Sequence, residues 1–322
     1  MLPHAKTRSV LLALLALTAL AAAESPQDSA DLPTYRSTAS EVRVTFFATD
    51  ENNHVLETLT KADFAVVDGE TVVRNFRSFA RSEETALDLV VLVDLSASVA
   101  PRFRVAIGDV LQLVAREQPT SDDRIAVLSF GGTQDYGGAF RQASSIRPVV
   151  LCSGGCHASD SMAKLQAAKS GGLTPLFDAL IFAADFIAQH RRAGVQPVLI
   201  LFSDGNDTIS VHSASEALRA AQGAGTMIYA VDLGSSLTSG GKFLQRVADG
   251  TGGRYFSPRF SGNQGAAALL NTVFEDLRAS YVVTYDLPSH QAGFHALRLL
   301  PTHNLNLTFH SRGGYNYEPS DR

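Results

Sequence analysis

Five oxygen-bearing residues from three distant parts of the chain have side chains that suit one metal site. These are Asp94, Ser96 and Ser98 in the run VVLVDLSASVA, Thr174 in SGGLTPLFDAL, and Asp204 in PVLILFSDGND. Two carboxylates and three hydroxyls make a hard, all-oxygen donor set, which suits Mg²⁺, Ca²⁺ or Mn²⁺. Such a set can leave one coordination position free, which an acidic side chain of a protein partner would fill.

The positions of these residues relative to apolar runs predict where they meet. Asp94 follows the apolar run 89–93, and Asp204 follows the apolar run 198–202. Ligands of an open α/β sheet collect at the carboxyl ends of its strands. Thr174 begins a helix-like run and is placed to cap that helix. We therefore expect the three segments to converge on one rim, with carboxylates that face solvent and contribute little to core packing.

The middle of the chain alternates between strand-like and helix-like segments. Strands are predicted at 87–94, 124–130, 197–204 and 226–234, and helices at 101–117, 174–190, 213–225, 241–253 and 264–281. Continuous apolar strands separated by helices of this length are typical of βα units. The predicted fold class is α/β, with a doubly wound, mainly parallel sheet and helices on both of its faces.

Both flanks of this region have the alternating pattern of strands. The N-terminal flank predicts a strand at 41–48 and a hairpin formed by 63–67 and 71–79, and the C-terminal flank predicts strands at 280–287, 294–300 and 305–311. The expected organisation is a linker at 24–40, a β segment at 41–84, the α/β domain at 86–279 and a second β segment at 280–318. We expect the two β segments to pack into one small sandwich, with the α/β domain inserted between them.

The five residues resemble the metal-ion-dependent adhesion site (MIDAS) of von Willebrand factor type A (VWFA) domains. The pattern of that site is Asp-x-Ser-x-Ser, a distant Thr and a distant Asp that is often in Ser-Asp-Gly. All five ligand positions are filled here, with Ala97 where family members often have Gly. The resemblance covers about residues 86–279. It implies a vWA/Rossmann-like fold, bound Mg²⁺ (or Ca²⁺/Mn²⁺) and work in cell adhesion or protein–protein interaction.

The flanking segments resemble a narrower group, the bacterial "VWFA-related" family first noted in Acidobacteria. The stretch LTKADFAVVDGETVVRNFRSF is similar to the segment that precedes the A domain in that family. FEDLRASYVVTYDLP and the terminal run from Arg312 to Tyr315 are also similar to its sequences. This resemblance spans residues 41–318 and implies an architecture more than a biological role.

The N-terminus has the three parts of a secretory signal peptide. Lys6 and Arg8 form a basic region, residues 10–23 are apolar, and the alanines at 21–23 offer a small-x-small cleavage pattern. The apolar part is short for a membrane span, although an uncleaved anchor is the alternative interpretation. We expect export to the periplasm or the extracellular space, with residues 1–23 removed.

Composition narrows the class of partner. Hydrophobic residues make up 45% and charged residues 18% of the 322 residues, which is typical of a globular protein with a sizeable core. Removing Lys6 and Arg8 leaves 25 of the 27 basic side chains against 32 acidic ones, a formal charge of −7. This balance disfavours nucleic acid and anionic membranes as partners. Beyond the signal segment, the sequence has no apolar run of 18 residues, so no span is expected in the mature chain.

The only cysteines, Cys152 and Cys156, lie in LCSGGCHASD. A local disulfide is the default interpretation in an exported protein. Free thiols and a metal cluster that includes the adjacent His157 are the alternatives. The loop closed by a disulfide here would be very short, so its contribution to stability would be small.

Other interpretations of the metal-site pattern are structural or enzymatic. Taken alone, Asp94 would be a helix cap and the serines turn formers; Asp178 would be a first-turn helix acid, and Asn206 and Asp207 would hold the Asp204 loop. The presence of all three segments favours the metal site over a metal-independent scaffold. A hydrolase is the weaker alternative, because Ser96 stands where phosphotransferases with a strand-end Asp nucleophile carry their acid/base Asp. No nucleophile elbow and no Walker loop occur, so we expect no enzyme activity.

Overall fold

The structure is a computed structural model that describes residues 41–82, 87–115, 124–131, 148–153, 156, 163–164, 170–193, 195–234, 239–257, 265–317 and 319. The predicted signal peptide at 1–23 and linker at 24–40 lie outside the described residues. Within the described part of the chain, no helix is both long and apolar enough to cross a membrane.

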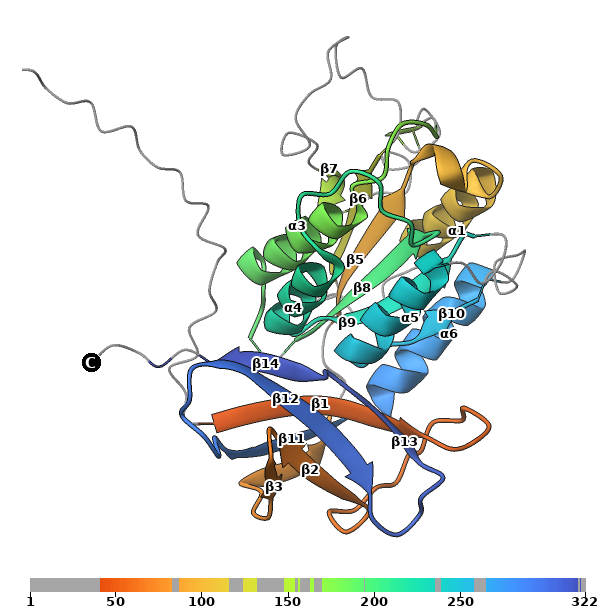
Figure 1. Ribbon diagram of the computed structural model, residues 1–322. Helices are drawn as coiled ribbons and strands as arrows, with labels where there is room; N and C mark the ends of the chain where they lie inside the picture. The colour runs from red at the N-terminus through yellow and green to blue at the C-terminus, as the bar shows by residue number, and fades with distance from the viewer. Residues whose placement is uncertain are drawn as a thin grey trace, which may run out of the picture. The chain divides into compact units, whose positions relative to one another are not determined.

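A six-stranded sheet forms the centre of the α/β domain (Figure 1). Its strands are β5 (Leu87–Asp94), β6 (Arg124–Phe130), β7 (Val149–Ser153), β8 (Gln196–Ser203), β9 (Met227–Asp232) and β10 (Tyr255–Phe256). The order is β10-β9-β8-β5-β6-β7, and every pair is parallel except β6 with β7. Since β5 lies between β8 and β6, the carboxyl ends of β5 and β8 are adjacent.

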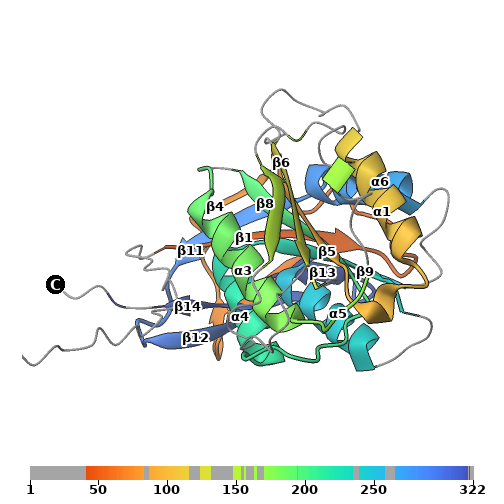
Figure 2. The same cartoon turned by 90° about the horizontal axis from the view of Figure 1, so that it is seen from above.

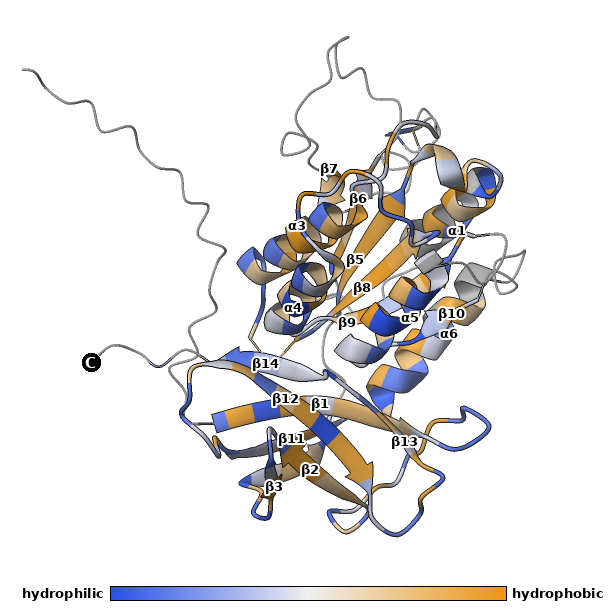
Figure 3. Cartoon of the chain, viewed as in Figure 1, coloured by the Kyte–Doolittle hydropathy of each residue, from blue (hydrophilic) through white to orange (hydrophobic). Residues whose placement is uncertain are grey.

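Helices cover both faces of this sheet, as predicted. They are α1 (Phe103–Ala115), α3 (Leu176–Gln189), α4 (Ala214–Ala224), α5 (Ser239–Thr251) and α6 (Gly265–Arg278). Val91 and Val93 of β5 belong to the core under α1 and α6, whereas Val90 and Leu92 belong to the core under α3, α4 and α5. Figure 2 shows α1 and α6 on one side of the sheet and α3 and α4 on the other. Because alternate residues of a buried strand serve both cores, residues 89–93 of β5 and 198–202 of β8 are continuously apolar (Figure 3).

The strands from the two flanks interleave in a β-sandwich. They are β1 (Glu41–Thr49), β2 (Phe64–Asp68), β3 (Thr71–Val73), β4 (Ser78–Arg81), β11 (Tyr281–Asp286), β12 (Gly293–Pro301), β13 (Thr308–Ser311) and β14 (Gly314–Tyr317). One sheet has the order β13-β1-β11-β4 and the other β14-β12-β2-β3. Each sheet contains strands from both flanks, so the α/β domain is an insertion between β4 and β11 (Figure 1).

Several predicted elements differ from the observed ones. The strand expected at 71–79 is two strands, β3 and β4, which belong to different sheets. The chain passes from one sheet to the other at their edges between β3 and β4, and the ring of Phe76 in this connection stacks on that of Phe64 with a centroid distance of 5.5 Å. The prediction also missed β7, β10 and β14, which are short strands at the edges of their sheets.

Aromatic and charged side chains join the sandwich to the α/β domain. Arg254, just before β10, pairs with Asp276 of α6. Its guanidinium carbon lies 5.2 Å from the ring centroid of Phe47 in β1, and the Phe47 ring stacks on His310 of β13 at 4.5 Å. The same guanidinium donates a hydrogen bond of 3.3 Å to the carbonyl of Asn53. Contacts of Arg254 therefore reach α6 and two segments of the sandwich.

Candidate metal-ion site

The carboxylate of Asp94 is held by two hydrogen bonds at the end of β5. Oδ1 accepts a bond of 2.8 Å from the backbone N–H of Ser96, and Oδ2 accepts a bond of 2.7 Å from the hydroxyl of Ser203, the last residue of β8. Asp94 is only 1% exposed and Asp204 only 4%, so the expectation that these carboxylates face solvent is wrong.

The two serines of the Asp-x-Ser-x-Ser run lie side by side. Ser96 precedes the short 3₁₀ helix η1 (Ala97–Val99), and its hydroxyl oxygen is 3.0 Å from that of Ser98. Neighbouring ligands of an octahedral ion, each about 2.1 Å from it, are about 3.0 Å apart. Ser96 is buried and Ser98 is exposed, so the pair extends from the interior to the surface. This spacing fits two adjacent ligands of one cation.

Backbone hydrogen bonds bring the Thr174 segment against the Asp94 loop. The N–H of Gly171 donates to the carbonyl of Leu95 at 2.8 Å, and the N–H of Ala97 donates to the carbonyl of Gly172 at 3.3 Å. Gly131, at φ +70°, lies against this junction: a Cβ there would be 3.0 Å from the nitrogen of Ser96. Thr174, which is 3% exposed, follows this junction by two residues.

Thr174 does not cap the helix that follows it, so that prediction is wrong. The N-cap of α3 is Pro175, which makes no side-chain capping hydrogen bond. Thr174 lies one position further from the helix, in the loop that contacts the Asp94 segment. Its hydroxyl is therefore not committed to capping α3.

The Asp204 segment closes the site from the end of β8. Oδ1 of Asp204 accepts a bond of 3.1 Å from the N–H of Asn206, as expected for a residue that holds this loop. Gly205 has φ +75°, and a Cβ there would be 2.2 Å from the carbonyl oxygen of Gly240. The tight turn after Asp204 therefore requires glycine.

The two carboxylates interact electrostatically. Burial raises the pKa of the Asp94 carboxyl to about 6, hydrogen bonds from Ser96 and Ser203 oppose this rise, and the charge of Asp204 adds to it. None of the ion pairs among the described residues includes Asp94 or Asp204. A divalent cation would supply the missing positive charge, so the residues present fit such an ion.

Hydroxyl ligands are essential to this interpretation. Across the described ranges, no group of three or more His, Cys, Asp or Glu side chains is arranged to hold a metal ion. A cation at this rim would be bound by the two carboxylates together with Ser96, Ser98 and Thr174. Such a site resembles the hard-oxygen sites of Mg²⁺ and Mn²⁺ more than a zinc site.

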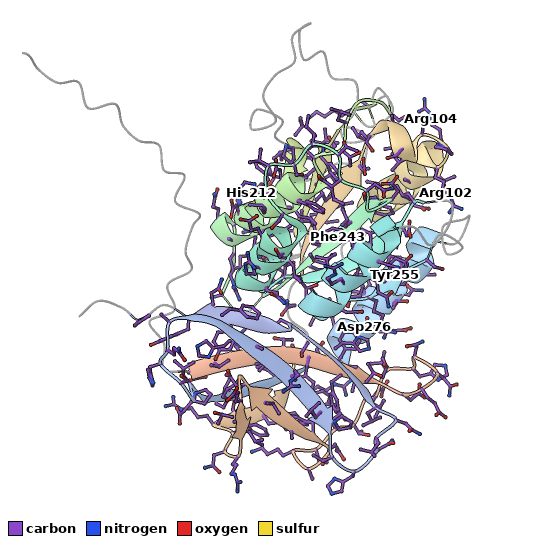
Figure 4. All side chains as sticks on the ribbon, in the orientation of Figure 1. Arg102, Arg104, His212, Phe243, Tyr255 and Asp276 are labelled. Carbon is purple, nitrogen blue, oxygen red and sulfur yellow. A yellow bond between two sulfur atoms is a disulfide. The ribbon has the colours of Figure 1, made fainter. Side chains whose placement is uncertain are left out.

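Sequence reasoning missed two residues that shape the site. Ser203 holds Asp94, as described above. Asp232 ends β9 at the same edge of the sheet, is fully buried, and accepts hydrogen bonds of 2.6 Å from the Tyr255 hydroxyl and from the N–H of Gly234. Burial raises the pKa of Asp232; the charge of Asp204 adds to the rise, and that of Arg102, labelled with Tyr255 in Figure 4, opposes it. The signal for Asp232 was available, because it follows an apolar run as Asp94 and Asp204 do.

Cys152, on edge strand β7, and Cys156 form a disulfide. His157, the third member of the alternative metal cluster, lies outside the described residues. With both thiols in the disulfide, neither is a thiolate available to bind a metal.

Comparisons with solved structures find several proteins of low sequence identity. A von Willebrand factor type A protein from Catenulispora acidiphila is 15% identical, with 88% of this chain and 64% of that chain covered and a TM-score of 0.46. Manganese-loaded TRAP protein from Plasmodium vivax is 14% identical, with 77% and 97% covered and a TM-score of 0.43. The vWF domain of the type V pili tip protein Mfa5 from Porphyromonas gingivalis is 14% identical, with 58% and 93% covered and a TM-score of 0.43.

None of the curated proteins compared with the chain matches it. A family model, by contrast, does match the sequence. The model of the von Willebrand factor type A domain matches residues 88–263, which is more than half of the chain and includes all five predicted ligands. This protein therefore belongs to the von Willebrand factor type A domain family.

Proposed function

We propose that this protein is a divalent-metal-dependent adhesion or protein–protein interaction module that binds an acidic side chain of its partner. Domains of this family mediate protein–protein interaction or adhesion. The observation that carries the metal-dependent part is the buried carboxylate of Asp94. It lies near a second buried carboxylate, Asp204, without an ion-pair partner among the described residues, and beside the hydroxyls of Ser96 and Ser98.

The chain's residues divide the work of binding. Asp94 and Asp204 would supply the negative charge, directly or through a water, and Ser96, Ser98 and Thr174 would supply neutral oxygens. The bound ion supplies a Lewis-acidic position that takes one oxygen of the partner. Where Asp204 binds through a water, Asp94 would be the one carboxylate in direct contact with the ion and the other direct protein ligands would be neutral hydroxyls, so the ion would attract a carboxylate of the partner.

The predicted location is part of the same proposal. The basic and apolar N-terminal segment supports export to the periplasm or the extracellular space. The disulfide between Cys152 and Cys156 is consistent with an oxidising compartment. An envelope protein that captures acidic partners fits both features.

We propose binding rather than catalysis. Ser96 occupies the position where a phosphotransferase would need a carboxylic acid, and it is engaged with Ser98. A metal-independent scaffold is the remaining alternative, and it predicts that the rim residues bind no cation.

Calorimetric titration of the folded protein with Mn²⁺ tests the proposal. We expect one binding event per chain, competed by Mg²⁺ and abolished by Asp94→Ala. Glu70→Ala is the matched control, because Glu70 is an exposed carboxylate in the sandwich turn after β2. Absence of binding by folded wild-type protein, or equal binding by Asp94→Ala, would favour the scaffold.

The partner is then sought with the same variants. Envelope extract is passed over immobilised protein with Mg²⁺ or with a chelator, and over the Asp94→Ala variant. A partner retained only by wild-type protein with Mg²⁺ supports the proposal. A partner retained equally in all three cases argues for the scaffold.

A further inference from the structure

The first turn of α3 is capped by a segment thirty residues away in sequence. Pro175 offers no side-chain acceptor. The hydroxyl of Ser210 instead accepts hydrogen bonds of 3.1 Å from the backbone N–H groups of Phe177 and Asp178, and Oδ1 of Asp207 accepts one of 3.3 Å from Phe177. Free N–H groups at a helix start need such acceptors, and here the loop after Asp204 provides them.

The helix returns hydrogen-bond acceptors to the same loop. Oδ2 of Asp178 accepts a bond of 3.1 Å from the N–H of Val211. Oδ1 of Asp178 accepts bonds from the N–H of His212 at 3.1 Å and from its ring Nδ1 at 2.8 Å. Figure 4 labels His212 near α3. Asp178 is therefore more than a first-turn acid favoured by the helix dipole, because it joins two segments.

A third connection involves a predicted ligand directly. The N–H of Thr174 donates to the hydroxyl of Thr208 at 2.8 Å, and the N–H of Thr208 donates to the carbonyl of Thr174 at 2.9 Å. The backbone of Thr174 is thus held on both sides by a residue four positions after Asp204. Ser210 is in turn fixed by Asp207, whose Oδ1 accepts its hydroxyl and whose Oδ2 accepts its N–H at 3.2 Å.

We infer that Asp178, Asp207, Thr208 and Ser210 form an inter-loop lock that positions Thr174 relative to Asp204. The two residues belong to different loops, and Gly172, at φ +71°, lies two positions before Thr174. The lock holds the Thr174 loop from its C-terminal side, where α3 begins. This inference rests on the proposed metal site, and it assigns the four residues positioning roles without contact with the ion.

The lock makes metal affinity depend on residues that are not ligands. Groups that orient metal ligands typically change affinity by about 10–100-fold when they are removed. Ser210 is the most informative of the four, because Ser210→Ala removes the acceptor of the Asp178 N–H and one of the two acceptors of the Phe177 N–H without changing the charge of the site. Loss of affinity in this variant cannot be attributed to loss of a nearby carboxylate.

The test is Mn²⁺ calorimetry of wild type, Ser210→Ala, Ser210→Thr and Ser213→Ala. Ser213→Ala is the matched control: Ser213 caps α4 by accepting a bond of 3.3 Å from Glu216, so this variant also loses a helix cap. We expect Ser210→Ala to bind Mn²⁺ about tenfold more weakly. Ser210→Thr, which keeps the hydroxyl, should recover most of that loss, and Ser213→Ala should bind as wild type does.

Hydrogen exchange of the metal-free proteins provides a second readout. Exchange at the amide of Asp178 should accelerate in Ser210→Ala and remain slow in Ser213→Ala. If Ser210→Ala loses this protection but binds Mn²⁺ as wild type does, the positioning role alone is overturned. Unchanged protection would overturn the lock itself. Absence of Mn²⁺ binding by wild type would overturn the proposed function, and with it the positioning role.

Discussion

The hydroxyl of Ser203 donates a hydrogen bond of 2.7 Å to Oδ2 of Asp94, joining the ends of two adjacent parallel strands. The same hydroxyl oxygen accepts a bond of 3.0 Å from the N–H of Gly205, so Ser203 also fixes the turn that carries Asp204. One small side chain thus connects both predicted carboxylate ligands. Its position at the end of β8 makes it part of the support of the site.

Ser203→Ala should therefore weaken metal binding while the protein stays folded. The buried Asp94 loses one of two donors, and the Gly205 N–H loses its acceptor, so we expect a loss of stability of about 1–3 kcal/mol. Metal affinity should fall by about tenfold or more, because the ligand is no longer oriented. Mn²⁺ calorimetry and urea unfolding measure the two effects. Ser129→Ala, at a buried serine of β6, serves as control for the loss of a core hydroxyl. Wild-type affinity in Ser203→Ala would show that Asp94 needs no such support.

The central fold could be predicted from sequence because its signals are local and strong. The apolar runs 89–93 and 198–202 are typical of strands buried on both faces, and an aspartate follows each within two residues. Short edge strands carry no such signal: β10 has two residues, and β14 is the four-residue run Gly314–Tyr317 that is ordered by pairing with the longer β12. The missed elements are those whose structure depends on a partner strand.

The site shows the same limit on a smaller scale. The sequence suggests the five candidate ligands by their residue types and spacing, but it does not suggest the contacts that hold them. Asp178 and His212 lie 34 residues apart and follow no periodic pattern, so only the fold reveals that they pair. Burial of Asp94 was also misjudged, since a residue at a strand end can be covered by loops that sequence does not place.

Asp94→Asn should separate metal binding from folding. In the metal-free protein the raised pKa of Asp94 means that its ionised form is disfavoured by burial. The folded state then binds more protons than the unfolded state between about pH 4 and pH 6, so the wild type loses stability as pH rises through that window, by at most about 3 kcal/mol. Removing the charge should leave metal-free stability at pH 7.5 near or above that of wild type.

The measurement is thermal unfolding of both proteins with EDTA and with Mg²⁺. Mg²⁺ should raise the Tm of wild type, because it binds only the folded state, and should not change that of Asp94→Asn. The matched Asp286→Asn variant, at an exposed carboxylate of β11, should respond to Mg²⁺ as wild type does. Equal stabilisation of Asp94→Asn by Mg²⁺ would place the ion elsewhere.

Arg254→Ala should be strongly destabilising, because it leaves a buried carboxylate without its ionic partner. The side chain of Asp276 is fully buried, and without Arg254 it still accepts a hydrogen bond of 3.1 Å from the hydroxyl of Tyr229. Breaking one side of such a pair costs about 3–5 kcal/mol. Arg77→Ala is the control, since the exposed pairs of Arg77 with Asp286 and Glu41 should each be worth less than about 1 kcal/mol. Urea unfolding compares the two variants, and similar small losses would show that the junction does not depend on Arg254.

His310 should make the protein less stable in mild acid. Burial first, and then the charge of Arg254, lowers its pKa to about 4, while a hydrogen bond with the backbone of Gly253 opposes the shift. The unfolded chain therefore binds more protons than the folded one between pH 4 and about pH 6.5. The contribution of neutral His310 to the free energy of unfolding is fully present above pH 6.5. About 3 kcal/mol of it is lost as the pH falls toward 4.

His310→Gln isolates this contribution from that of other groups. Asp276 acts in the opposite direction, because burial raises its pKa to about 6 and the folded state gains stability as that carboxyl is protonated. The comparison is therefore the difference in unfolding free energy between wild type and His310→Gln at pH 7.5, 5.5 and 4.5. The advantage of wild type should shrink as pH falls. A constant difference across the three pH values would mean that His310 accepts a proton as readily in the folded protein as in the unfolded chain.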